Sequence, residues 1–176
     1  MKAFDVMTSA IVSQDDNGMS APQRESNCGV SSSLFLSPAR LLLCDDQKLI
    51  RTRVRQILRQ LPAIQVIGEA SDGRLAVSMA LELKPDIILM DVSMPELNGI
   101  QATRQILSQS PGMLVLAYSA DTNEHTVRQM FTAGACGFVS KTGDPTELIS
   151  ALSKVLAGEP FFSVQANDAP RWPRLD

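Results

Sequence analysis

This 176-residue sequence contains five short apolar runs, and four of them lead into polar or charged side chains. The first run is followed by the acidic pair Asp45 and Asp46, and the third is followed by Asp91. The fourth run ends at Ser119 and the fifth leads into Lys141. Three carboxylates brought together repel one another, because two unit charges 4 Å apart cost roughly 4 kcal/mol at an effective dielectric constant of 20. A divalent cation with oxygen ligands removes that repulsion, so the pattern predicts a Mg²⁺ site.

The lysine and the serine fit the same chemistry. Lys141 supplies a compact positive charge, and the hydroxyl of Ser119 can donate a hydrogen bond to an anion. A carboxylate such as Asp91, beside Mg²⁺ and an ammonium group, is suited to nucleophilic attack on phosphorus. The metal and the lysine would then neutralise the acyl phosphate. Each residue alone is more often a turn residue or a solvated charge, and it is their conjunction that indicates a site.

Apolar runs and helix-period segments alternate along the middle of the chain and must position these residues. The apolar runs begin at residues 41, 64, 87, 114 and 137, at intervals of 23 to 27 residues. The spacing predicts helices over 47–61, 73–83, 99–109, 122–133 and 145–157. Such alternation indicates parallel strands covered by helices on both faces, joined by right-handed crossovers. The ligand site of a doubly wound sheet lies beyond the carboxyl ends of its strands.

The predicted helix over 47–61 has two distinct faces. Its apolar residues, predicted to face inward, are Leu49, Ile50, Ile57, Leu58 and Leu61. Its basic residues, predicted to face outward, are Lys48, Arg51, Arg55 and Arg59. We interpret the basic row as a solvated face, and a docking surface for an acidic partner helix is the alternative.

Several helix ends are marked by capping residues. Asp121 with Glu124 three residues later predicts a start like a capping box, and Asp144 before Pro145 predicts an N-cap. Gly134 and Gly158 stand where the fourth and fifth helices should stop.

Charge and composition exclude several classes of function. The net charge of −3 leaves no strong positive field for nucleic acid, and no apolar run approaches the ~18 residues that span a membrane. The three cysteines, an odd number at wide spacing, predict a reduced cytoplasmic protein. Cys44 and Cys136 are predicted to be small buried side chains. His125 is the only histidine, so no histidine-based metal site or triad is predicted.

The two ends of the sequence differ from its middle. Residues 1–38 contain eight serines and no sustained periodicity, which predicts a flexible N-terminal extension. Residues 159–176 contain three prolines and are predicted to form a C-terminal tail.

Residues 40–158 resemble the receiver domain of bacterial two-component response regulators. The resemblance rests on Asp45-Asp46, the stretch Asp91-Val-Ser-Met-Pro-Glu-Leu-Asn-Gly-Ile100, Ser119 and Gly137-Phe-Val-Ser-Lys141. The run from Gly134 to Lys141 is similar to the subfamily that usually carries a C-terminal helix-turn-helix. The resemblance implies a flavodoxin-like doubly wound sheet of five parallel strands, in the order 2-1-3-4-5, with five helices. We expect this receiver domain to span residues 39–158.

The resemblance also implies a role for each residue at the strand ends. Asp91 would accept the phosphoryl group from a histidine kinase. Asp46 and Asp91 would bind Mg²⁺, Asp45 would act on the metal from slightly farther away, and the backbone carbonyl of Ser93 would complete the protein's ligands. Lys141 would pair with the phosphoryl group.

Two further residues match the conformational switch of the family. Ser119 corresponds to the hydroxyl residue that moves toward the phosphoryl group, and Phe138 corresponds to the aromatic residue that turns inward with it. Many receivers have proline after the lysine, whereas Thr142 follows here, so nothing in the sequence forces a cis bond at this point.

The expected function is that of a phosphoacceptor in a two-component phosphorelay that signals by conformational switching. The alternative is a truncated transcriptional regulator without its DNA-binding output domain, because only 18 residues follow Gly158. An enzyme with turnover is not expected: aspartate-nucleophile phosphohydrolases place a second Asp where Ser93 stands. Phosphorylation from a donor and slow self-dephosphorylation are expected instead.

The resemblance implies a sensor histidine kinase or a phosphotransfer protein as partner. Homodimers through helices one and five or four and five both fit, and the sequence does not choose between them. No direct contact with nucleic acid or membrane is expected.

Overall fold

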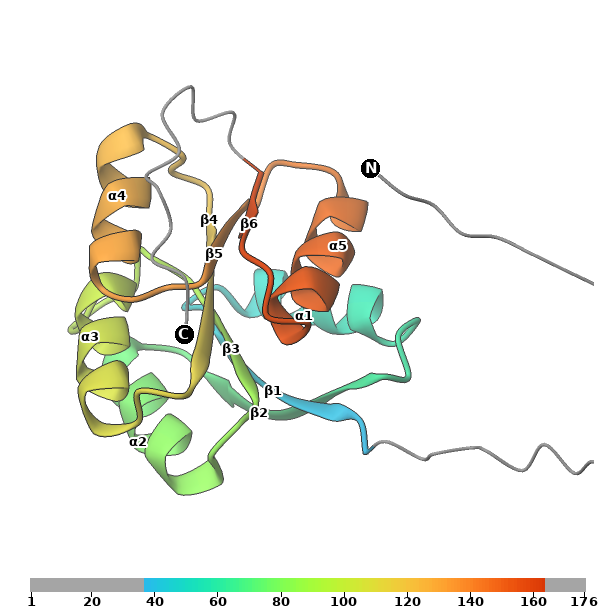
Figure 1. Cartoon of the computed structure of the whole chain (residues 1–176), viewed down its shortest axis with the longest axis horizontal. Coiled ribbons are helices and arrows are strands. Elements are labelled where there is room, and N and C mark those ends of the chain that lie inside the picture. Colours follow the sequence, from blue (N-terminus) through green and yellow to red (C-terminus); the bar gives the residue numbers. More distant parts are fainter. Residues whose placement is uncertain (1–36, 164–176) are drawn as a thin grey trace, which may run out of the picture. The chain divides into compact units, whose positions relative to one another are not determined.

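One parallel sheet with helices on both faces makes up the part of the chain that the computed structural model describes, residues 37–163 (Figure 1). The strands are β1 (Ala39–Cys44), β2 (Ile64–Ala70), β3 (Ile87–Met90), β4 (Leu114–Ser119), β5 (Gly137–Ser140) and β6 (Phe161–Phe162). The helices are α1 (Lys48–Leu58), α2 (Gly73–Leu83), α3 (Gly99–Gln109), α4 (Glu124–Thr132) and α5 (Pro145–Leu156). Most of the predicted extension over 1–38, and the part of the predicted tail after residue 163, lie outside the described residues.

The strands are arranged in the order β2-β1-β3-β4-β5-β6, and every pair is parallel. The predicted order 2-1-3-4-5 is confirmed, and β6 is added at the β5 edge. Residues 161–162, which we expected in a tail, pair with β5 through Gly137↔Phe161 and Phe138↔Phe162. The reason is apolar burial: Phe161 and Phe162 pack against opposite sides of the sheet, each on a different core cluster.

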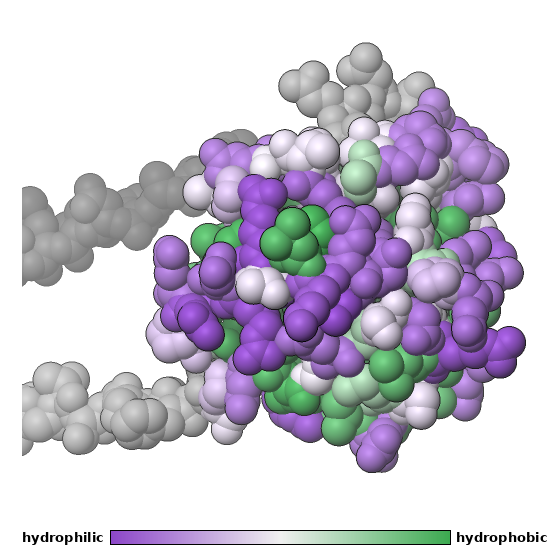
Figure 2. All heavy atoms as spheres, turned by 180° about the vertical axis from the view of Figure 1, so that it is seen from behind, coloured by the Kyte–Doolittle hydropathy of each residue, from purple (hydrophilic) through white to green (hydrophobic). Residues whose placement is uncertain are grey.

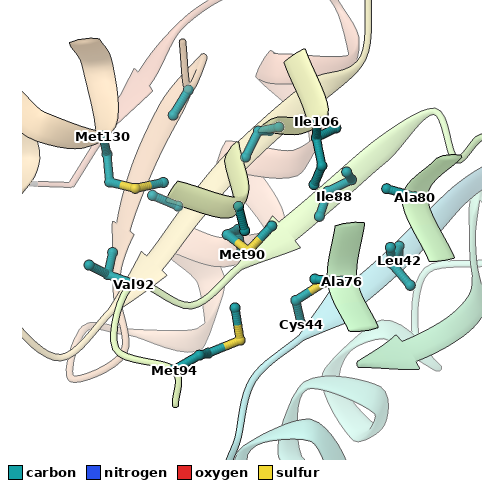
Figure 3. Packing of buried hydrophobic residues seen from close by; sticks show 14 of the residues in the cluster. Leu42, Cys44, Ala76, Ala80, Ile88, Met90, Val92, Met94, Ile106 and Met130 are labelled. Atoms are coloured by element: carbon teal, nitrogen blue, oxygen red, sulfur yellow. The ribbon is translucent and has the colours of Figure 1, made fainter. Parts of the chain in front are cut away.

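Alternate residues of each strand enter two separate hydrophobic clusters, as the two-residue period of a strand requires. Leu42 and Cys44 of β1 pack beneath α2 and α3 in the first cluster, together with Ile88 and Met90 of β3 (Figure 3). Leu41 and Leu43 enter the second cluster, under α1 and α5. Because β1 and β3 are buried on both faces, their carboxyl ends are held firmly in place.

The helices agree closely with their predicted spans, with two corrections. Leu49 is 80% exposed rather than inward, because the buried stripe of α1 runs through Val54 and Leu58 instead. Helix α4 begins at Glu124, and its N-cap is Asn123, whose side chain accepts a hydrogen bond from the Thr126 amide. The predicted cap, Asp121, instead binds the side chains of Asn123 and Thr126.

Helix α1 ends at Leu58, three residues before its predicted end, and the other predicted capping residues are confirmed. The Asp144 carboxylate accepts a hydrogen bond from the Thr146 amide at the start of α5. Gly134 and Gly158 adopt φ values of +102° and +81° just after α4 and α5. These left-handed conformations are accessible to glycine at little cost, which is why each helix stops there.

The face opposite to that of Figure 1 is mostly hydrophilic, with one hydrophobic area near its centre and a broader one across its lower part (Figure 2). None of the helices in residues 37–163 is long and apolar enough to cross a membrane.

Cys44 is buried, which raises the pKa of its thiol well above the usual range. Cys136 is half-buried with a pKa of about 11, and His125 is exposed at the start of α4.

Candidate functional site

Backbone hydrogen bonds align the carboxyl ends of neighbouring strands at the same edge of the sheet. The amide of Asp45 donates to the Ala70 carbonyl at 3.0 Å, and the amide of Asp91 donates to the Cys44 carbonyl at 2.8 Å. On the other side, the Lys141 amide donates to the Ser119 carbonyl at 2.8 Å. The parallel register therefore fixes the places of these residues before any side chain interacts.

Lys141 lies between two buried carboxylates. Its Nζ is 2.7 Å from Oδ2 of Asp45 and 2.9 Å from Oδ2 of Asp91. The three side chains are 8%, 1% and 3% exposed. Burial opposes the charge of the lysine, but the two carboxylates outweigh that effect and raise the pKa of Lys141. The ammonium group thus compensates part of the negative charge at the strand ends.

The two residues of the acidic pair have different environments. Asp45 is fully buried, and its Oδ1 accepts a hydrogen bond from the Gln47 amide at 2.9 Å. Burial raises the pKa of Asp45, and its bonds to Lys141 and Gln47 offset only part of that effect. Asp46 is exposed, and within residues 37–163 no hydrogen bond to its carboxylate is found. Asp46 therefore has free oxygens available for a ligand from solvent.

The donor set fits a Mg²⁺ ion. Asp45, Asp46 and Asp91 each offer a carboxylate oxygen, and these oxygens lie within 4.8 Å of one another. Opposite ligands of an octahedral Mg²⁺ ion are about 4.2 Å apart, since each Mg–O bond is ~2.1 Å. The spacing of the three carboxylate oxygens is therefore compatible with the ion, and the all-oxygen ligands match its preference.

The loop from Asp91 to Gly99 is held tightly against α2 and α3. A Cβ atom on Gly99 would overlap the carbonyl oxygen of Asp91, and one on Gly73 at the start of α2 would overlap that of Leu97. The Ser93 amide donates to Oδ1 of Asp91 at 3.3 Å. The two glycines thus fix the backbone that carries both Asp91 and the predicted carbonyl ligand, Ser93.

The residues predicted to act as a switch are buried beside this edge. Ser119 is 1% exposed, and its Oγ accepts a hydrogen bond from the Asp121 amide at 3.1 Å. Phe138 is fully buried in the cluster beneath α4. Thr142, after the lysine, forms a hydrogen bond with the hydroxyl of Ser140 at 2.8 Å, and no cis peptide bond occurs in residues 37–163.

An ionic network that was not predicted from the sequence lies beside the acidic pair. Arg51, which we placed on a solvated face, is only 15% exposed, and its Nε is 2.9 Å from Oε2 of Glu69. Arg55 contacts the other carboxylate oxygen of Glu69 at 2.7 Å. The hydrogen bonds of both arginines lower the pKa of Glu69. The available signal was Glu69 itself, the only charged residue in the strand Ile64–Ala70.

Comparison with known proteins matches this architecture. The model of the response regulator receiver domain family matches residues 41–153. Response regulator GacA of Pseudomonas viridiflava is 36% identical over 126 residues, covering 72% of this chain and 59% of the relative. The nitrate/nitrite response regulator protein NarL of Escherichia coli K12 is also 36% identical over 126 residues, covering 72% and 58%. The chain thus spans about three-fifths of the length of these relatives.

Solved structures show the same similarity. A two-component response regulator of the LuxR family from Aurantimonas sp. SI85-9A1 superposes with a TM-score of 0.70 at 35% identity, covering 72% of this chain and 91% of that one. The signal receiver domain of the putative response regulator NarL from Mycobacterium tuberculosis gives 0.67 at 31% identity, covering 70% and 99%. With the site and the sheet order already described, these matches show that the chain belongs to the response regulator receiver domain family.

Proposed function

We propose that this chain accepts a phosphoryl group on Asp91 from a histidine kinase or a phosphotransfer protein and signals by a change of conformation. The observation that supports this most strongly is the placement of Lys141 Nζ between Asp45 and Asp91, next to the exposed carboxylate of Asp46. The arrangement combines a nucleophile, a fixed cation and a set of metal ligands in one small space.

The reaction forms a bond between phosphorus and a carboxylate oxygen of Asp91, while the bond from phosphorus to the donor group breaks and the donor keeps its electron pair. A bound Mg²⁺ ion, held by Asp46, Asp91 and the Ser93 carbonyl, would supply charge neutralisation for the phosphoryl oxygens. Lys141 stays protonated at neutral pH because its pKa is raised, and it stabilises the same charge. Water later attacks phosphorus and returns the free carboxylate and inorganic phosphate.

The switch would follow from an exchange of partners at Ser119. Its Oγ now accepts a hydrogen bond from the Asp121 amide, which leaves its own hydrogen able to donate. A phosphoryl oxygen on Asp91 would attract that hydrogen and draw Ser119 toward it. Phe138 lies in the core beneath α4, so a change at the β4–α4 loop would bias how α4 packs.

Labelling with acetyl phosphate tests the proposal. The wild type should gain the mass of one phosphoryl group in the presence of Mg²⁺, and much less after chelation. Asp91→Asn should gain none. The matched control Asp144→Asn, which alters an exposed capping carboxylate that is not a member of the acidic cluster, should be labelled like the wild type. Equal labelling of the Asp91→Asn protein would rule out Asp91 as the acceptor.

A role within a transcriptional regulator is a second candidate function, supported by the greater length of the relatives GacA and NarL. Within the chain described here we propose no direct contact with nucleic acid, a cytoplasmic location, and dimerisation of the phosphorylated form through its helices. Gel-shift assays with random DNA and sedimentation before and after phosphorylation test these points. Binding to DNA by this chain alone would contradict the proposal.

Slow loss of the phosphoryl group is proposed in place of enzymatic turnover. Ser93 stands two residues beyond the nucleophile and cannot act as a general acid in the way a carboxylic acid can. Phosphomonoesters such as p-nitrophenyl phosphate should therefore be hydrolysed no faster by the wild type than by Asp91→Asn. Sustained turnover that depends on Asp91 would contradict this part of the proposal.

A further inference from the structure

The guanidinium group of Arg51 contacts the backbone that carries the acidic pair. Its Nη1 donates to the carbonyl oxygen of Asp45 at 2.7 Å and lies 3.4 Å from that of Asp46. Both carbonyls follow the last residue of β1, so the sheet does not provide their partners. A buried carbonyl without a hydrogen bond is costly, and Arg51 fills this need at Asp45.

Glu69 holds Arg51 in this orientation. Its Oε2 accepts from Nε of Arg51 at 2.9 Å, while β2 places Glu69 directly beside Leu43 of β1. The guanidinium of Arg51, in the first turn of α1, therefore connects β2 with the residues that follow β1, through three contacts made by two nitrogen atoms of one plane. Such planar, charge-assisted contacts are stronger and more directional than those of a lysine.

Electrostatics alone would not favour this arrangement. A permanent cation beside a site for a divalent cation repels the metal, so Arg51 should weaken Mg²⁺ binding if charge were its only effect. Any favourable effect of Arg51 on Mg²⁺ binding therefore has to come from geometry, and Glu69 compensates the unfavourable charge. The lowered pKa of Glu69 keeps that compensation in place at neutral pH.

We propose that Arg51 is a positioning residue for the metal site: held by Glu69, it fixes the backbone of Asp45 and Asp46 in the geometry that Mg²⁺ binding requires. This inference rests on the proposed function, since it deepens the role of the same site. Arg51 touches neither the metal nor the phosphoryl group and acts through the acidic pair.

Mg²⁺ titration by calorimetry, without any phosphodonor, distinguishes geometry from charge by the sign of the effect. Arg51→Met should weaken Mg²⁺ binding about tenfold, which corresponds to about 1.4 kcal/mol. The matched control is Arg55→Met: it removes the same charge from the same helix and the same carboxylate, but no contact with the acidic pair. Its binding should be unchanged or slightly tighter. Mg²⁺ binding by Arg51→Met that equals or exceeds that of the wild type overturns the inference.

Two further measurements strengthen the test. Arg51→Lys keeps the charge but cannot make all the contacts, so it should stay within about threefold of Arg51→Met; full recovery would overturn the geometric explanation. In the metal-free protein, the Gln47 amide, which donates to Oδ1 of Asp45, should exchange its hydrogen faster in Arg51→Met than in the wild type. Unchanged exchange would also count against positioning.

Three outcomes distinguish a folding defect, a failure of the proposed function and a failure of the role proposed for Arg51. If Arg51→Met fails to fold, Arg51→Gln takes its place with the same expected direction, because it also removes the charge and the contacts with the carbonyls of Asp45 and Asp46. If the wild type itself binds no Mg²⁺ and is not labelled on Asp91, the proposed function fails. If the wild type binds and is labelled while both variants bind equally well, only the role of Arg51 fails.

Discussion

Replacing Lys141 by methionine should destabilise the metal-free protein strongly. The change keeps an unbranched apolar side chain as far as Cε but leaves the buried carboxylates of Asp45 and Asp91 without the cation that now lies 2.7 and 2.9 Å away. Removing one member of a buried ion pair typically costs 3–5 kcal/mol. The protein can limit this cost by protonating one carboxyl group.

The free energy of protonating one carboxyl group sets an upper bound on this loss of stability. Taking up a proton at pH 7 on a carboxyl group with an ordinary pKa near 3.9 costs about 4 kcal/mol, from about three pH units at 1.36 kcal/mol each. Burial already raises the pKa of Asp45, so the cost there is smaller. We therefore expect Lys141→Met to lose about 3 kcal/mol in the free energy of unfolding at pH 7.

The loss of stability in Lys141→Met should depend on pH in one direction. Without Lys141 the folded-state pKa of Asp45 rises further above its unfolded value, so the folded state binds more protons and is favoured at lower pH. The deficit of the variant should thus be largest at pH 7 and should shrink toward pH 5. Saturating Mg²⁺ should shrink it as well, because the ion replaces the lost charge.

Urea denaturation at pH 7 and pH 5, with and without Mg²⁺, measures these differences. The control Lys48→Met changes an exposed lysine on α1 and should stay within about 0.5 kcal/mol of the wild type. A Lys141→Met protein as stable as this control, or one whose deficit grows as the pH falls, would refute the view that the lysine holds the two carboxylates together.

Three further predictions concern other parts of the domain. Gly73→Ala should displace the loop at Leu97, lower the free energy of unfolding by more than about 1 kcal/mol and weaken Mg²⁺ binding. The control Gly112→Ala, whose added Cβ meets no atom within 4 Å, should have none of these effects, as urea denaturation and calorimetry can measure. Glu69→Gln should be less stable than the wild type at pH 7, and the gap should close as the pH falls through the depressed pKa of Glu69; a gap that is constant down to pH 3 would contradict this. Leu49→Asp, which alters an 80% exposed side chain, should slow phosphotransfer from a partner kinase while leaving labelling by acetyl phosphate unchanged, and equal slowing of both would indicate damage to the site itself.

The residues at the strand ends could be predicted because a parallel sheet leaves little freedom there. Once β1, β3 and β5 are recognised, Asp45, Asp91 and Lys141 must emerge at the same edge, and the structure places all three within salt-bridge distance. Their burial and the protonation of the lysine could not be read from the order of residues, because both depend on packing from helices far along the chain.

Features that depend on side-chain direction were harder to predict. Leu49 and Ile50 are adjacent and differ by about 100° around α1, so only one can face the sheet, and the phase is set by Val54 and Leu58. Arg51 has the same spacing as a solvated arginine, and only its meeting with Glu69 on β2 shows otherwise. The two-residue strand β6 is too short to give a periodic signal.

The short strand β6 and the residue after it connect the C-terminal part of the described chain to β5 and to α4. Ser163, immediately after it, donates its amide to the Phe138 carbonyl and accepts the Ser140 amide at its Oγ, at 3.1 and 2.8 Å. Phe162 packs against Phe131 of α4, with the two rings tilted and their centroids 4.5 Å apart. A force applied to the polypeptide at residue 163 would therefore reach the residue before Lys141 through one hydrogen bond and α4 through one ring pair. We therefore expect tension at residue 163 to change Mg²⁺ binding by the acidic cluster, and Mg²⁺ binding to change the force that the strand resists.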